Sequence, residues 1–279
     1  MCFILAFSGC SLNRIAVRST SGILFHSFEA LLAEDDLVLA QTAIESDLKL
    51  VEGLIRSDPS NSGLLLLASQ GFASYALAFV EDENPERAKR LYLRGRDYAM
   101  KWISMQYDVN LLALENLDDF ILAVQNLPPK AVPGVFWAGN SWASAMLLSL
   151  SDVQSIASLP RGETMMQFVL DYDETYYYAG AHLFFCGYYG GRPKMLGGDP
   201  VKAEFHIDRH KELTGGDFLL GDYFRVKYIA LPALDEISAR RTLLHVQNYD
   251  LEKAPSIRLV NAIAKKKAVV LLENVEDYL

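Results

Sequence analysis

The sequence predicts an all-α fold, and three observations support this. Apolar residues recur at intervals of three and four along most of the 279 residues, which is the spacing of amphipathic helices. No segment shows the convincing period-two alternation that marks a half-buried strand. Between residues 72 and 95, large and small side chains alternate in the way that two closely packed antiparallel helices require.

This helix pair gives the strongest local signal in the chain. Asn84, Pro85 and Glu86 stand between its two helices and supply an N-cap, a first-turn proline and a first-turn acid. The packing positions are Phe72, Tyr75, Ala76, Phe79, Ala88, Tyr92 and Gly95. Their offsets resemble those of a tetratricopeptide (TPR) hairpin. We therefore expect divergent TPR-like helical hairpins stacked into a curved α-solenoid.

Other segments are expected to form further helices. Apolar periodicity and capping residues predict helices over residues 21–33, 36–56, 108–123, 135–148, 163–172 and 258–278.

Two later helix pairs depart from the first. A pair beginning at residues 174–188 carries a loop rich in glycine and proline over residues 190–198, where such residues interrupt a helix. A third pair, over residues 218–249, has Lys227 at the position that Ala76 holds in the first pair. The repeat therefore decays along the chain.

Composition and charge exclude some classes of protein. A hydrophobic content of 51% is ample for a core, and the net charge is −9. Because binding of nucleic acid needs a basic surface, we expect none. The basic runs at residues 87–96 and 265–267 are interpreted as solvated helix faces. No stretch reaches the roughly 18 consecutive apolar residues of a membrane-spanning helix.

The first ten residues resemble the end of a bacterial lipoprotein signal. An apolar run is followed by the small residues Ser8 and Gly9 and then by Cys10, although no basic segment precedes the run. We expect lipidation of Cys10, with residues 1–9 as a signal-peptide remnant, 10–30 as a lipid-anchored segment and 31–279 as one TPR-like domain. The alternative is an ordinary apolar segment packed on the first helix.

Cysteine usage agrees with an envelope location. Once Cys10 is acylated and Cys2 removed, Cys186 remains alone and can form no intramolecular disulfide. Its neighbours are apolar, which favours a small buried side chain over a reactive thiol.

Several segments together resemble the T components of TPR-protein-associated tripartite ATP-independent periplasmic (TRAP) transporters. They are the pair at residues 64–102, the double-tryptophan helix at 136–142, the pair at 177–184 and 196–203, and the last helix at 258–264. The resemblance covers residue 30 to the end. It implies a periplasmic lipoprotein, membrane-bound through its lipid alone, that binds the periplasmic substrate-binding protein. A small hydrophobic or organic-acid ligand is a further candidate partner.

No catalytic or metal site is expected. His206 and His210 share a helix face, but zinc needs a third ligand, so interhelical or surface histidines are favoured. His182 is expected to be a satisfied core residue. The loop at residues 190–198 lacks the order of a phosphate-binding motif. We expect no cofactor and no enzymatic activity.

The aromatic residues form the best candidate for a binding site. Trp137 and Trp142 are five residues apart, so on a helix they point in different directions. Three successive tyrosines from residue 176 cover most of a helix circumference, so at least one must leave the local core. The predicted ligand- or partner-binding residues are Trp137, Asn140, Trp142, Tyr177, Tyr188 and Arg192. The alternative is that these side chains only fill a loosely repeated solenoid.

Three classes of function remain open from the sequence. They are the transporter accessory protein, a general TPR scaffold lipoprotein for assembly of the cell envelope, and an enzyme with an unrecognised site, of which the first is favoured. The high hydrophobic content also predicts a homo-oligomer, with a trimer as the specific expectation.

Overall fold

The computed structural model describes residues 17, 22–24, 26–149 and 152–278. All regular structure in these residues is helical, which confirms the predicted all-α class. A helical segment over residues 22–24 and 26–32 comes first. The α-helices that follow are α2 (Leu37–Ser57), α3 (Ser62–Tyr75), α4 (Pro85–Tyr107), α5 (Leu117–Gln125), α6 (Val132–Leu147), α7 (Val153–Asp173), α8 (Tyr176–Gly190), α9 (Pro200–Thr214), α10 (Leu220–Arg225), α11 (Glu236–Asn248) and α12 (Arg258–Glu273).

Shorter helical turns lie between these elements. They are the π-helices η1 (Ala76–Val80) and η5 (Val226–Ala230) and the 3-10 turns η2 (Leu111–Ala113), η3 (Pro129–Ala131), η4 (Lys194–Leu196), η6 (Leu251–Lys253), η7 (Pro255–Ile257) and η8 (Val275–Tyr278).

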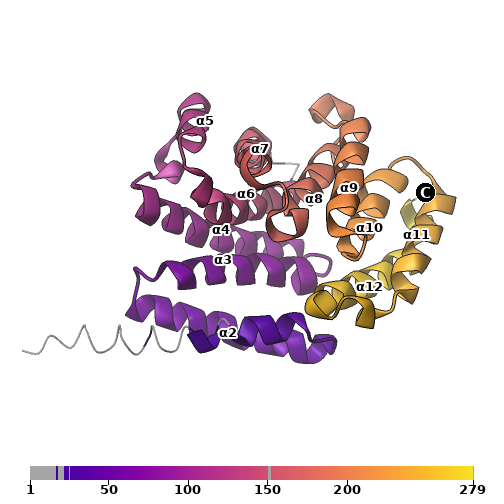
Figure 1. Ribbon diagram of the computed structural model, residues 1–279. Helices are drawn as coiled ribbons and strands as arrows, with labels where there is room; N and C mark the ends of the chain where they lie inside the picture. Colours follow the sequence, from indigo (N-terminus) through magenta and orange to yellow (C-terminus); the bar gives the residue numbers. More distant parts are fainter. Residues whose placement is uncertain (1–16, 18–21, 25, 150–151, 279) are drawn as a thin grey trace, which may run out of the picture.

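The helices pack mainly against their neighbours in the chain. α2 lies on α3, α3 on α4, α4 on α6 and α6 on α7, and the stack continues through α8 and α9 (Figure 1). The last helix, α12, packs on α10 and α11 and also contacts α2. The C-terminal helices therefore return to the N-terminal end of the stack (Figure 1).

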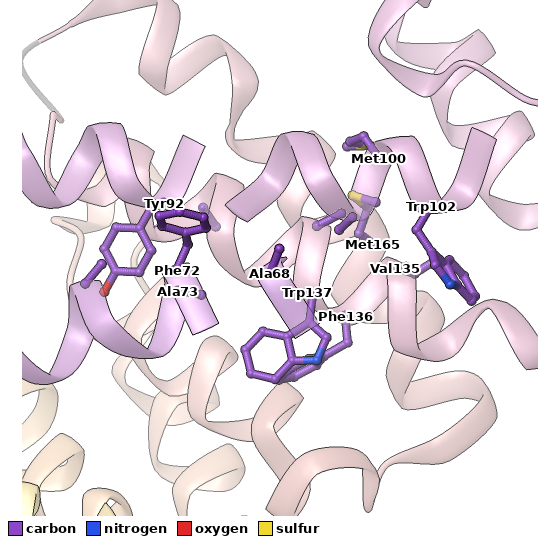
Figure 2. Packing of buried hydrophobic residues seen from close by; sticks show 14 of the residues in the cluster. Ala68, Phe72, Ala73, Tyr92, Met100, Trp102, Val135, Phe136, Trp137 and Met165 are labelled. Atoms are coloured by element: carbon purple, nitrogen blue, oxygen red, sulfur yellow. The ribbon is translucent and has the colours of Figure 1, made fainter. Parts of the chain in front are cut away.

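Two hydrophobic clusters form the core. The larger one joins α2, α3, α4, α6, α7 and part of α8, and it includes Phe72, Tyr92 and Trp137 (Figure 2). The smaller one joins the rest of α8 to the helices that follow it. Leu77 packs against both clusters. The boundary between them passes beside η1.

Polar side chains set where most of the long helices begin. In each case the side chain of the N-cap residue accepts a hydrogen bond from a backbone N–H of the first turn, which is otherwise unpaired. The N-cap residues that do so are Asp36, Asn61, Asn84, Asn116, Asp152, Asp199 and Asp235.

The π-helices η1 and η5 are features that the apolar periodicity does not predict. Each ends the first helix of a hairpin, and each is closed by a five-residue hydrogen bond. The N–H of Glu81 donates to the carbonyl of Ala76 at 2.9 Å, and that of Leu231 to Val226 at 3.0 Å. A π-turn turns the side chains that follow it relative to an α-helix, and such turns are frequent at functional sites.

Two predicted helices differ from those observed. The helix expected over residues 108–123 is divided, because Asn116 caps a new helix after the turn η2. The helix expected over 163–172 begins earlier, at Val153, and includes Pro160. Proline lacks the N–H that a helix interior uses, so it concealed the first half of α7 from the sequence pattern.

The basic run at residues 265–267 is also not a fully solvated face. Lys266 is exposed, but the side chain of Lys267 is only 5% exposed and forms an ion pair with Asp82. The solvated interpretation is therefore wrong for Lys267. This ion pair joins α12 to the turn between η1 and α4.

One helical stretch, Ser62–Val80, is long and apolar enough to cross a membrane by length and composition alone. Within the protein, 67% of its apolar window is buried. The core helix of a soluble protein passes the same test, and α3 and η1 are central to the larger cluster.

Candidate functional site

A mostly apolar cavity of about 340 Å³ lies where the two hydrophobic clusters meet. Its walls come from α3, η1, α4, α6, α8, α10, η5 and α12. Of the predicted binding residues, Trp137, Asn140 and Tyr177 line it. Cavities with apolar walls and a few polar groups are the usual form of a small-molecule site.

Aromatic rings form one wall of the cavity. The Trp137 side chain is 3% exposed, and its ring centre lies 4.5 Å from that of Tyr177 in an edge-on arrangement. The ring centre of Phe136 lies 5.7 Å from that of Tyr177. The hydroxyl of Tyr177 accepts a hydrogen bond from the Gln70 amide at 3.4 Å, so the ring is held at both ends.

The backbone around Tyr177 is strained. Tyr177, Tyr178 and Ala179 all have left-handed backbone angles, with φ values of 46°, 57° and 54°. For residues other than glycine this conformation costs roughly 1–2 kcal/mol each. The expectation of a regular helix that carries the tyrosines around its circumference is therefore wrong. Residues held in such conformations cluster at functional sites.

Packing holds this left-handed turn in place. Tyr178 stacks on Phe218 with ring centres 5.0 Å apart, and Ala179 is buried. Gly180 follows directly, and a Cβ atom at that position would lie 2.6 Å from Phe136. The absence of a side chain at Gly180 thus lets α8 approach α6 closely beside the cavity.

The cavity also has two charged residues, Glu81 and Lys227, among the described residues that line it. Their side chains meet at 3.4 Å, and the hydroxyl of Tyr92 donates to the other oxygen of Glu81 at 2.6 Å. Burial disfavours the charged ammonium of Lys227, but Tyr228 and Glu81 overcome this effect and raise its pKa. Lys227 therefore stays protonated.

The remaining three predicted residues lie elsewhere. Trp142 packs edge-on against Phe120 at 6.0 Å, with Arg96 over its ring. Tyr188 is buried and donates to Glu163 at 2.8 Å. Arg192 lies 3.6 Å from the centre of the Tyr188 ring. None of the three lines the cavity.

Comparison with known proteins gives the family. The sequence pattern of the TRAP transporter T-component family matches residues 33–279. The chain belongs to the TRAP transporter T-component family. A protein from Treponema pallidum (strain Nichols), described as uncharacterised, is 23% identical over 307 residues that cover 97% of this chain and 93% of the relative.

Membership gives the broad role of this T component. The family is one of transport components rather than enzymes, which implies association with partners of a transport system and with the cell envelope. Cys10, the predicted lipidation site, lies outside the described residues.

A group of buried histidines lies behind the left-handed turn of this T component. Nδ1 of His182 and Nδ1 of His206 are 3.0 Å apart, and Nε2 of His182 lies 3.3 Å from Glu174. Burial lowers the pKa of His206 and of His210 to about 4, so both are neutral. Of the two positions that the sequence leaves open for His206 and His210, on the helix surface or between helices, the structure has the buried one, and His182 lies in the core as predicted. In the described part of the chain, no three potential metal ligands are grouped.

Cys186 is a fully buried free thiol in α8, as predicted. Burial raises its pKa to about 12, so it remains protonated and unreactive in the folded protein.

Sequence reasoning missed Glu81, Tyr92 and Lys227 as cavity residues. One signal was available, because Lys227 occupies a position where the first hairpin has a small residue. A long charged side chain there cannot pack as alanine does. The sequence pattern presents this lysine as decay of the repeat and does not assign it to a site.

Proposed function

We propose that this protein is the accessory component that docks the periplasmic substrate-binding protein of a TRAP system, and that its cavity binds that system's apolar or organic-acid ligand. The observation that carries the ligand proposal is the Trp137–Tyr177 wall, which lines a cavity of about 340 Å³. Aromatic walls with few polar groups suit ligands that are mostly apolar.

The strained turn supports the same proposal. Tyr177, Tyr178 and Ala179 have left-handed backbone angles, and the Tyr177 ring lies against Trp137 in this conformation. Each of these three residues costs roughly 1–2 kcal/mol in this conformation. A need to hold Tyr177 in position for binding explains why the protein keeps it.

Ligand binding can be tested with a cavity-blocking variant. Ala78→Phe adds a ring at a residue that lines the cavity. Ala113→Phe is the matched control, because Ala113 is exposed in η2 and does not line the cavity. We expect an environment-sensitive apolar dye to bind the wild type and Ala113→Phe equally, and Ala78→Phe at least about tenfold more weakly. Equal binding by both variants contradicts an apolar site here.

Docking is tested separately. We propose that the partner is the substrate-binding protein encoded beside this chain, and reversible cross-linking followed by pull-down is the direct measurement. A complex at micromolar concentration supports docking. No complex at high micromolar concentration, with both proteins folded, rejects it.

We further propose that the mature protein is a periplasmic lipoprotein acylated at Cys10. Replacing this cysteine, as Cys10→Ser, should move the protein from the membrane fraction to the soluble periplasmic fraction. An unchanged distribution in the membrane fraction rejects acylation at this residue.

The hairpin α3–η1–α4, with its TPR-like packing positions, supports a divergent TPR-like solenoid for the chain. We propose that it assembles into a homotrimer. Val201 and Phe205, one turn apart on α9, are exposed by 79% and 62%, and we take this apolar pair as part of the covered surface. Sedimentation that shows only monomer at micromolar concentration rejects the oligomer.

A further inference from the structure

The two charged side chains in the cavity, Lys227 and Glu81, differ in how exposed they are. Lys227 and Glu81 both line the cavity, but the side chain of Lys227 is 31% exposed and that of Glu81 is 12% exposed. A molecule that enters the cavity therefore meets the cation more readily than the anion.

The two side chains also differ in how well their hydrogen-bonding capacity is used. Oε2 of Glu81 accepts a short hydrogen bond of 2.6 Å from Tyr92. The ammonium of Lys227 has three donors, and one of them donates to Oε1 of Glu81 at 3.4 Å. A charge-assisted contact is usually about 2.7–2.9 Å, so this one is weak.

Two aromatic rings also lie beside the Lys227 ammonium, and the Asp82 carboxylate contributes to its electrostatic environment. The ammonium lies 5.5 Å from the centre of the Tyr228 ring and 5.9 Å from that of Tyr223. Rings stabilise a cation through their faces, and the side chain of Tyr228 also forms a hydrogen bond with the Lys227 ammonium. With Glu81 and Tyr228 each taking one of its three donors, one donor remains for a further acceptor beside an apolar wall.

Resting on the apolar site proposed above, we propose that the ligand is an amphiphile with a single anionic head group, carboxylate or phosphate, that Lys227 binds. The hydrocarbon part lies against Trp137 and Tyr177, and the head group accepts a hydrogen bond from the ammonium. Glu81 competes with the ligand for this ammonium and holds it in place in the empty cavity.

Four ten-carbon probes, used below their critical micelle concentrations, test the head group. They are decanoate, decyl phosphate, decanol and decyltrimethylammonium, and calorimetry measures their affinities for the full chain. A charge-assisted hydrogen bond predicts that decanoate or decyl phosphate binds roughly tenfold or more tightly than decanol. The tighter of these two anions identifies the head group. The cationic probe should bind most weakly.

Three variants assign the preference to Lys227. In Lys227→Met the anions should lose their advantage of roughly tenfold while decanol still binds. In Glu81→Gln the anions should bind more tightly than to the wild type, since the competing carboxylate is neutral and the amide oxygen can still accept from Tyr92. Lys266→Met, which changes an exposed lysine on α12, is the control and should change nothing. A merely structural role for the pair predicts weaker binding in both cavity variants.

The outcomes separate this inference from the proposal on which it rests. Equal affinity of the wild type for anion and alcohol overturns the head-group inference and leaves an apolar site. So does an anion preference that survives in Lys227→Met. If the wild type binds no probe, the apolar site itself is rejected, and the inference fails with it.

Discussion

The close approach of α8 to α6 at Gly180 can be tested with one added methyl group. In Gly180→Ala the new Cβ would lie 2.6 and 2.8 Å from two ring atoms of Phe136. Contacts this short require the ring to move. Phe136 is buried, with Trp137 5.0 Å away and Tyr176 5.2 Å away, both edge-on. The ring therefore has little space into which to turn.

The size of the effect follows from two opposing terms. Overpacking of a well-packed core costs about 1–3 kcal/mol. Alanine in a helix stabilises by about 0.5–1 kcal/mol relative to glycine, and Gly180 has no positive φ that would add backbone strain. The free energy of unfolding should therefore fall by about 1–2 kcal/mol.

Gly53→Ala in α2 is the matched control. Nothing lies within 4 Å of a Cβ at Gly53, so the helix term acts alone and should raise the free energy of unfolding by about 0.5–1 kcal/mol. Urea denaturation followed by circular dichroism measures both variants. The free energy of unfolding should fall in Gly180→Ala and rise in Gly53→Ala. Equal stabilisation by the two alanines would show that the contact between Gly180 and Phe136 is absent.

Three further predictions concern buried groups. Burial lowers the pKa of His206 and His210 from 6.5 to about 4, so as the pH falls the unfolded chain binds protons before the folded protein does. The free energy of unfolding should therefore decrease between pH 6.5 and pH 4, by about 3 kcal/mol for each histidine. If the double variant His206→Asn, His210→Asn loses the same free energy of unfolding over this range, the prediction is refuted. Asp82→Ala should destabilise more than Lys267→Met, since it leaves the buried ammonium unpaired, and the reverse order in urea would contradict the ion-pair argument. Cys186 should resist alkylation until the protein unfolds, and peptide-level labelling under native conditions would disprove it.

Much of the fold could be predicted because local signals agreed with the packing. The N-caps Asn84 and Asp199 mark where α4 and α9 begin, since each side chain binds a free N–H of the first turn. Apolar spacing marked the core face of α3. The start of α7 could not be predicted in this way, because Pro160 lies within the helix and in sequence looks like a proline that ends one.

The candidate site was only half predictable, and the reason is geometric. Trp137 and Asn140 lie on the regular helix α6, and both line the cavity. Arg192 lies over the ring of Tyr188 and donates to its backbone carbonyl at 2.6 Å, a local pairing within one helix end. In the sequence, an arginine close to aromatic residues looks the same whether it packs on one of them or lines a cavity.

Two of the three cavity residues that sequence reasoning missed, Glu81 and Lys227, lie at departures from the α-helix. Glu81 follows η1 and Lys227 lies in η5, and a π-turn changes the direction of the side chains after it. Tyr177, which is one of the predicted residues, lies in the left-handed turn, where the backbone also departs from the α-helix. A periodicity of 3.6 residues cannot place side chains whose backbone does not follow it. Three separate irregularities converge on one cavity, and a packing role alone gives no reason for that convergence. A binding role does, because a ligand site needs side chains that point away from the core of their own helix.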